Sequence, residues 1–385
     1  MAVRTDLWWL NLVDRKMRLL LRVAAVTFPI VLIFVQIGFY DAVFKTATVI
    51  QESLNADLFL VSSAYINISR AGTFPRARLY QAASVSGVDR VAPLYVGHRA
   101  YQNPITLDRR ELLVFGIDPD ERSFRLPEVS SQLRALTVPD TVLIDRNSRP
   151  EFGPQQTGTT TQVERKRVEI VGQYTIGTGF AAVGDLIATD QTFSRIFDGQ
   201  TLERVSVGLV QATPGSAASD VQAIARGIRA LLPPDTRALT RAEMFDLEEN
   251  FWLRTTSIGL IFGLGTAVAF AVGFLILYQV LSSDIARQLS EYATLKALGY
   301  DDRALAMIVV RQGFALSFAS YAPALLLALW IYHMTRSATH LPMGMTVGRV
   351  GGVLFLTLAM SAASGWLALR KLRAADPVDL FSVQT

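Results

Sequence analysis

The sequence predicts an α-helical membrane protein with four transmembrane helices and a large α+β extracytoplasmic domain inserted between helices 1 and 2. Four long apolar runs predict the helices: one lies near the start and three lie in the last third. The long, mostly polar segment 41–254 between the first two runs predicts the domain. Composition agrees, because 51% hydrophobic residues and a mean hydropathy of +0.31 exceed what an ordinary soluble protein shows but are low for a chain that is membrane throughout.

Each apolar run is long enough to cross a bilayer, which takes about 20 residues for about 30 Å of hydrocarbon. The segment before the first run, 1–22, is interpreted as a cytoplasmic or interfacial helix because Trp8 and Trp9 stand beside basic residues. The predicted spans are 23–40, 255–283, 312–335 and 350–369.

Lysine and arginine beside the spans predict the orientation. They are concentrated in the N-terminal segment, in the segment 284–311 and in the tail 370–385, whereas the loop 336–349 has only Arg336 and Arg349. By the positive-inside rule, both termini and 284–311 lie in the cytoplasm and 336–349 is a short periplasmic loop. The protein is therefore expected to be a multi-pass membrane component with 41–254 on the outer side.

The segment 41–254 combines short β-rich stretches bounded by turn residues with amphipathic helical stretches. We expect α+β layers in two lobes, one formed by the ends of the segment and one inserted between about residues 89 and 189. The predicted strands are 57–62, 112–116, 141–145, 168–172 and 205–210, and the predicted helices are 74–86, 191–197 and 217–232.

The residues point to no catalysis and no cofactor. There are no cysteines, the three histidines have no metal-ligand spacing, and no Gly-x-x-x-x-Gly-Lys-Ser/Thr phosphate loop occurs. The net charge of +4 is attributed to the membrane flanks, so no nucleic acid is expected as a partner. The acidic stretch 118–121 is interpreted as a turn and His98 as a surface or strand residue. The stretch 165–167 is interpreted as a solvated hairpin, with binding of a partner or an acidic ligand as the alternative.

A charged stretch between spans two and three, Asp284–Tyr300, has the pattern of a helix followed by a turn. Its apolar residues recur at three- and four-residue spacing, and Gly299 stands where a helix C-terminus favours glycine. Asp284 and Arg287 are opposite charges three residues apart. The segment therefore predicts a helix-turn beside the cytoplasmic membrane face. An inert interfacial turn is the alternative.

The second span is longer than a bilayer requires, since its 29 charge-free residues cover about 43 Å as a helix. The preceding segment 241–254 also has a helical pattern, and together they would make a continuous helix from the outer domain to Asp284–Tyr300. Small residues recur every fourth position, which lets helices approach closely. Span one, another internal span, a second copy or mere chance all remain open as explanations of this pattern, formed by Gly259, Gly263, Ala267 and Ala271.

Four stretches spread over most of the chain carry a family resemblance: Pro139–Gly153, Gly177–Asp190, Phe251–Thr256 and Glu291–Tyr300. With them, the layout of one span, a large domain and three more spans resembles the FtsX/MacB-type permeases of ABC transporters. Within that family the chain resembles the DevC subgroup. The resemblance implies a MacB-like periplasmic domain and a location in a bacterial inner (plasma) membrane.

The resemblance further implies a homodimeric permease without a nucleotide site of its own, working with a separate ABC ATPase that binds ATP. A periplasmic membrane-fusion adaptor and an outer-membrane TolC-like channel would complete an exporter for a glycolipid-like substrate, driven by mechanotransmission. Many relatives have a glutamate where this chain has Arg311-Gln312, so no role for that glutamate is transferred. In this family the ATPase contact would be made by Glu291, Leu295, Lys296, Leu298, Gly299 and Tyr300.

Two other functions of the same fold stay open: a lipoprotein-releasing permease, and an FtsX-like signalling protein that controls a cell-wall hydrolase. The size of 41–254 favours export, because a signalling relative usually has a smaller outer domain. A membrane-anchored enzyme is disfavoured, since no nucleophile–base pair or metal set is visible.

Overall fold

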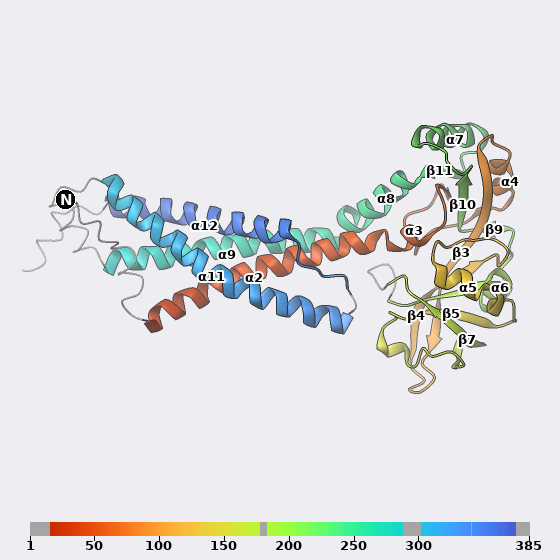
Figure 1. The fold of residues 1–385 in the computed structure, drawn as a ribbon, viewed down its shortest axis with the longest axis horizontal. Coiled ribbons are helices and arrows are strands. Elements are labelled where there is room, and N and C mark those ends of the chain that lie inside the picture. Colours follow the sequence, from red (N-terminus) through yellow and green to blue (C-terminus); the bar gives the residue numbers. More distant parts are fainter. Residues whose placement is uncertain (1–15, 178–182, 288–301, 340, 375–385) are drawn as a thin grey trace, which may run out of the picture. The chain divides into compact units, whose positions relative to one another are not determined.

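The computed structural model describes residues 16–177, 183–287, 302–339 and 341–374 (Figure 1). The chain divides into two compact units. The first, here the membrane unit, comprises Met1–Asp41, Leu260–Thr335 and Met343–Thr385, and the second, the α+β unit, comprises Ala42–Gly259 and Arg336–Pro342.

Within the described residues, four helices are long and apolar enough to cross a membrane. Together with the sheet-rich α+β unit that follows the first of them, they confirm the predicted fold class. Their lengths exceed the predicted spans, and the second begins two residues later than the sequence suggests. They are α2 (Lys16–Ala47), α9 (Ser257–Arg287), α11 (Asp302–Thr339) and α12 (Val347–Ala374).

The four helices share one apolar core. Val26, Ile30 and Phe34 of α2 are fully buried in it, together with Leu277 of α9 and Met360 of α12. Hydrogen bonds from side chains to the backbone of another helix add directional contacts, since hydrocarbon offers polar groups no water. They run from Thr27 Oγ1 to the Ser320 carbonyl (3.2 Å), from Tyr321 Oη to Val350 (2.6 Å) and from Ser364 Oγ to Phe274 (2.9 Å).

The α+β unit is built on a sheet whose nine described strands run in the order β11-β1-β10-β3-β4-β8-β5-β7-β6. A short pair, β2 with β9, lies apart from it. The strands are β1 (Leu58–Ser62), β2 (Phe74–Pro75), β3 (Val88–Gln102), β4 (Arg109–Ile117), β5 (Thr141–Asp145), β6 (Thr160–Val163), β7 (Lys166–Tyr174), β8 (Asp185–Thr189), β9 (Arg204–Val205), β10 (Val207–Ala212) and β11 (Thr236–Thr240).

Short helices accompany the sheet, and apolar clusters form on both of its faces. One cluster includes α4 and α7 residues such as Leu79 and Ile228, and the other includes Val129 of α5 and Met244 of α8. The helices are α3 (Val49–Ser53), α4 (Ala77–Ala83), α5 (Pro127–Leu136), α6 (Asp190–Ile196), α7 (Ala218–Leu231) and α8 (Arg241–Asn250).

Strand β3 joins the two ends of the sheet. Its first half pairs with β10 and its second half with β4, and its last residues also pair with β6 through Tyr101–Val163 and Gln102–Gln162. That extra pairing closes β3, β4, β8, β5, β7 and β6 into a ring. The segment expected to form an inserted lobe supplies this ring, and the ends of the α+β unit supply β1, β10 and β11.

The sequence analysis did not predict β3, although it is the longest described strand. Pro93 argues against a strand in a sequence, because proline has no N–H for a sheet ladder. In the structure Pro93 faces Gly208 of β10, and pairing with β4 starts only at Leu94, so the proline side of the strand needs no ladder bond. Gly97 is required for packing, since a Cβ there would overlap the Phe197 ring.

The expected continuous helix from the α+β unit into the second span is wrong. Helix α8 ends at Asn250, a π-helical turn covers Phe251–Thr255, and Thr256 is extended (φ −85°, ψ 156°) before α9 starts at Ser257. The Thr256 hydroxyl accepts a hydrogen bond from the Ile258 amide at 3.3 Å, as a helix N-cap does. Threonine is a suitable N-cap for α9 because its side-chain oxygen replaces an intrahelical acceptor that the first turn lacks. The extended backbone that Thr256 adopts as N-cap interrupts the helical path from the preceding turn.

Three smaller expectations are confirmed. Residues 119 and 120 form a turn, in which the Asp118 carboxylate accepts from the Asp120 amide at 3.1 Å. The stretch 165–167 lies at the β6–β7 hairpin, and His98 lies in β3.

Candidate functional site: the helix ends around the coupling segment

Most of the helix-turn predicted over Asp284–Tyr300 falls outside the described residues, and we call the undescribed residues 288–301 the coupling segment. This applies to each predicted ATPase-contact residue. They are Glu291, Leu295, Lys296, Leu298, Gly299 and Tyr300. What the structure describes is the pair of helices that lead into and out of the segment, α9 up to Arg287 and α11 from Asp302.

These helices are held together by a small apolar cluster near the segment. Leu281 and Ile285 of α9 pack with Val309 of α11 and Ala368 of α12, and all four are at most 4% exposed. Close packing of this kind leaves little room for one helix to shift alone. The cluster therefore ties the last turns of α9 to both α11 and α12.

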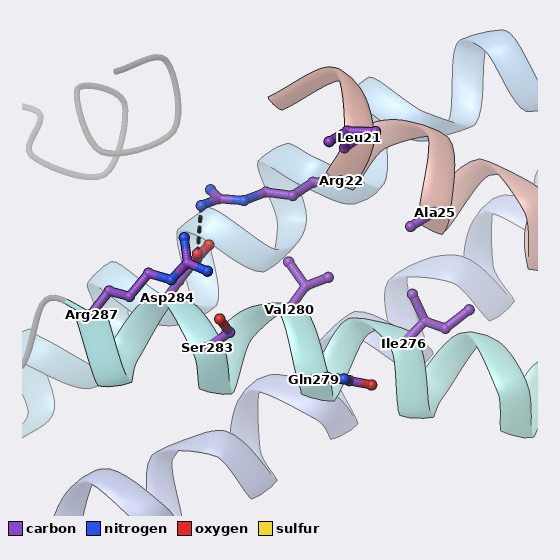
Figure 2. A pocket seen from close by; sticks show the side chains of 9 residues that line it. All are labelled: Leu21, Arg22, Ala25, Ile276, Gln279, Val280, Ser283, Asp284 and Arg287. Carbon is purple, nitrogen blue, oxygen red and sulfur yellow. Dashed lines mark ion pairs between the residues drawn. The ribbon is translucent and has the colours of Figure 1, made fainter. Parts of the chain in front are cut away.

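An ion pair ties α2 to the same end of α9. Arg22 Nη2 lies 2.6 Å from Asp284 Oδ1, and the two side chains are only 18% and 9% exposed (Figure 2). The sequence suggested Arg287 as the ionic partner of Asp284, because residue spacing identifies only neighbours along the same helix. The partner from α2 is more than 250 positions away in the chain, and no sequence periodicity reveals it.

A second polar tie joins α2, α11 and α12 at their other ends. Arg349 donates to Asp41 Oδ2 at 2.5 Å and to the Gly344 carbonyl at 2.7 Å, and its guanidinium lies 5.3 Å from the Tyr332 ring centroid. The Tyr332 hydroxyl donates to the Phe34 carbonyl of α2. The Arg349 side chain is 4% exposed. The sequence analysis used Arg349 only as a topology signal, whereas the structure makes it a buried anchor.

The small residues predicted for helix packing are largely not used inside the described bundle. Gly263, Ala267 and Ala271 are exposed, and a Cβ added at Gly263 would meet nothing within 4 Å. Gly259 lies at the start of α9, close to the Leu253 backbone of the preceding π-helical turn. Of the explanations left open by the sequence, a second copy and mere chance both stay open for the exposed face.

A different small-residue stripe on α9 makes the internal contacts. A Cβ at Gly265 would overlap Gln36 of α2, and a Cβ at Gly273 would lie 2.5 Å from Met360 Sδ and 3.1 Å from Pro29 Cβ. Ala269 between them is 2% exposed. This stripe has the same four-residue spacing as the predicted one but lies on another face of the helix. The sequence contains both stripes, and only packing distinguishes them.

In the α+β unit, a buried glutamate lies on α8, the last helix before the break at Thr256. Glu248 is 0% exposed and accepts a hydrogen bond from Tyr65 Oη at 2.5 Å. Burial raises the pKa of Glu248 to about 7, although the Tyr65 hydroxyl, the Ile68 amide and Gln51 partly offset that rise. Sequence patterning treats a glutamate at this helical position as solvent-facing and misses it.

Glu248 makes the stability of the α+β unit depend on pH. Its pKa is higher in the folded state than the ordinary 4.5, so the folded state holds the proton longer. Stability from this group is therefore lost as pH rises from about 4.5 to about 7, by about 3 kcal/mol in total. We expect Glu248→Gln to reduce this loss in thermal unfolding of the full-length protein between pH 5 and pH 7.5. The exposed Glu203→Gln variant should keep it, and an unchanged pH slope in Glu248→Gln would refute the assignment.

Within the described residues, no group of three or more His, Asp or Glu side chains is placed to hold a metal ion. The described parts of the site are an apolar cluster and an ion pair at the helix ends next to the coupling segment, and an arginine anchor at the other helix ends.

Solved structures with similarity include the periplasmic region of MacB from Actinobacillus actinomycetemcomitans (10% identity, TM-score 0.36, covering 52% of this chain and 96% of that one). A second is the extracellular domain of the ABC-type transporter YknZ from Gram-positive bacteria (12% identity, TM-score 0.34, covering 48% of this chain and 99% of that one). A third is a domain of a putative permease protein from Porphyromonas gingivalis (11% identity, TM-score 0.32, covering 48% of this chain and 89% of that one). No curated protein matches the sequence.

A family model adds information on the C-terminal part of the chain. The matched stretch contains α9, the coupling segment, α11 and α12, that is, three of the four candidate spans and the helix ends described above. Residues 256–377, about a third of the chain, match the FtsX-like permease C-terminal domain.

Proposed function

We propose that the protein is the permease subunit of an ABC exporter and couples ATP hydrolysis by a separate ATPase to motion of the α+β unit. The match of residues 256–377 to the FtsX-like permease C-terminal domain is the observation that supports this most directly. The sequence has no phosphate loop of its own, so ATP binds to the partner subunit.

Force enters at the coupling segment between α9 and α11. The Arg22–Asp284 pair and the Leu281–Ile285–Val309–Ala368 cluster link this end of α9 to the other three helices. A push on the segment then moves the bundle as a packed body. Helix α2 is continuous from Lys16 to Ala47, whereas α9 begins at the Thr256 break, so we assign transmission toward the α+β unit to α2 and a joint to Thr256.

The proposed wider assembly is based on the resemblance of the sequence to the DevC subgroup. In this proposal a homodimer in the inner membrane has both termini in the cytoplasm and works with a periplasmic membrane-fusion adaptor and an outer-membrane TolC-like channel. The substrate is glycolipid-like and does not pass through the spans, whose sequences have no acidic or basic residue other than histidine. The exposed face of α9 at Gly263, Ala267 and Ala271 is available to the second copy.

A pull-down from native membranes in mild detergent tests the proposal, with stoichiometric partners identified by mass spectrometry. We expect an ABC ATPase with the wild-type protein, and at least about a tenfold loss of it with Glu291→Lys, because the reversed charge opposes the contact. The control Glu203→Lys, at an exposed position of the α+β unit, should retain the ATPase.

The same experiment separates the alternatives. Recovery of an adaptor with the ATPase supports export, whereas a cell-wall hydrolase without an adaptor would replace export by signalling. An ATPase that binds Glu291→Lys as well as wild type, with both proteins equally stable, would contradict the assignment of the coupling segment.

A further inference from the structure

A groove on the membrane unit, between α2 and the last turns of α9, has the lining of a lipid site. Its volume is about 480 Å³, within the range of small-molecule sites. All of its lining residues belong to the membrane unit. They are Leu21, Arg22, Ala25, Ile276, Gln279, Val280, Ser283, Asp284 and Arg287.

The lining changes from charged to apolar along the helices. Figure 2 shows Arg22, Asp284 and Arg287 gathered at one end of the groove, with Ala25 and Ile276 at the other. From Arg287 to Ile276 the helix rises by about 16 Å, roughly half the thickness of the hydrocarbon layer. The groove therefore runs from the headgroup level to about the middle of the bilayer, as one acyl chain does.

Charge at the polar end favours an anionic occupant. Two guanidinium groups face one carboxylate there, which leaves one net positive charge among the described lining residues. Arg22 is paired with Asp284, while Arg287 is exposed and its fork of N–H donors suits a phosphate. Ser283 and Gln279, also exposed, add neutral hydrogen-bonding groups.

The apolar end excludes a free anion as the intended occupant. Ala25, Ile276 and Val280 offer only hydrocarbon contacts, which a phosphate ion cannot use. A phospholipid uses both ends: its phosphate lies at Arg287, and the upper part of one acyl chain runs past Val280 toward Ala25 and Ile276. The volume holds a headgroup and the upper part of one chain, not a whole lipid.

We infer that this groove binds one anionic phospholipid, with the phosphate held by Arg287 beside the Arg22–Asp284 pair and one acyl chain along the apolar walls. The occupied groove would sit against the helix end that leads into the coupling segment. The inference depends on the membrane fold and not on the proposed ATPase partnership, so either can fail without the other.

Native mass spectrometry of the full-length protein from nanodiscs tests it, using phosphatidylglycerol and phosphatidylcholine in equal amounts. We expect phosphatidylglycerol to be retained at least about fivefold over phosphatidylcholine, the effect of about one arginine at a membrane surface. Arg287→Gln should remove this preference by weakening the headgroup contact. Ala25→Trp should lower retention of phosphatidylglycerol by filling the apolar end, with Ala25→Leu as the milder variant where tryptophan prevents folding.

The matched control is Arg311→Gln, an exposed arginine of α11 outside the groove, which should leave retention unchanged. Equal retention of the two lipids by wild type would overturn the inference. So would a loss in Arg287→Gln without any loss in the Ala25 variants, or displacement of the lipid by inorganic phosphate, since either result would indicate an anion site alone.

Discussion

Replacement of Arg349 by alanine is expected to destabilise the membrane unit by about 3 kcal/mol, because it removes the hydrogen bonds and the packing of a buried guanidinium. The loss leaves the Asp41 carboxylate, 31% exposed, without the guanidinium 2.5 Å away, and it also frees the Gly344 carbonyl. The Tyr332 ring loses its cation contact as well. Thermal unfolding of the wild type and the variant in the same detergent measures this loss of stability.

Two further variants make the result specific. The exposed Arg311→Ala should change stability little, because it removes a charge without breaking a buried pair. The double variant Arg349→Met/Asp41→Leu should recover much of the loss, since apolar residues of similar size often replace a buried ion pair at little cost. A double variant that is less stable than Arg349→Ala would show that Asp41 contributes independently of Arg349.

Reversal of the Arg22–Asp284 pair is expected to have the second large effect. Arg22→Asp and Asp284→Arg each place two like charges at a contact that is 2.6 Å long and mostly buried, so each should cost about 3 kcal/mol or more. Each should also weaken recovery of the ATPase, because α2 would no longer be fixed to the helix that leads into the coupling segment. The combined Arg22→Asp/Asp284→Arg variant restores opposite charges.

Thermal unfolding and ATPase pull-down of the three variants measure both effects in parallel. The double variant should be more stable than either single variant and should recover the ATPase. If the double variant loses as much stability as the two single variants together, the two residues do not interact energetically. That result would contradict the ion pair between α2 and α9 as a tie.

The sequence predicts the membrane helices well because hydrophobic length is a local property. Each span could be found as a mostly apolar run of 18 or more residues without Asp, Glu, Lys or Arg, without knowledge of its neighbours. Short β-rich stretches such as 57–62 and 141–145 were found for the same reason, since the β-favouring residues and the turn residues that bound them lie within a few positions of one another.

The features that the sequence did not predict depend on partners far away along the chain. Pro93 is compatible with strand β3 only because the pairing of β3 with β4 starts at the next residue, Leu94. The buried Glu248 carboxylate accepts its hydrogen bond from Tyr65, which lies 183 positions earlier. The Arg349–Asp41 pair spans 308 positions. Pattern rules carry no information at such separations.

The candidate site illustrates the same boundary. Two stripes of small residues on α9 have identical spacing, and the sequence offers no reason to choose Gly265, Ala269 and Gly273 over the stripe that starts at Gly259. The structure decides because Gln36 and Met360 leave no room for a Cβ at Gly265 and Gly273. The break at Thr256 was missed since a threonine within a helical pattern can either continue a helix or cap the next one.

The central claim, that the segment between α9 and α11 receives force from an ABC ATPase, is tested most directly by photocrosslinking in living cells. A photoreactive amino acid replaces Leu298 in one strain and Leu275, a 58% exposed residue within α9, in another. The account predicts a covalent adduct with an ABC ATPase from position 298 and none from position 275. No ATPase adduct from position 298, in a protein that is folded and present in the membrane, would contradict it.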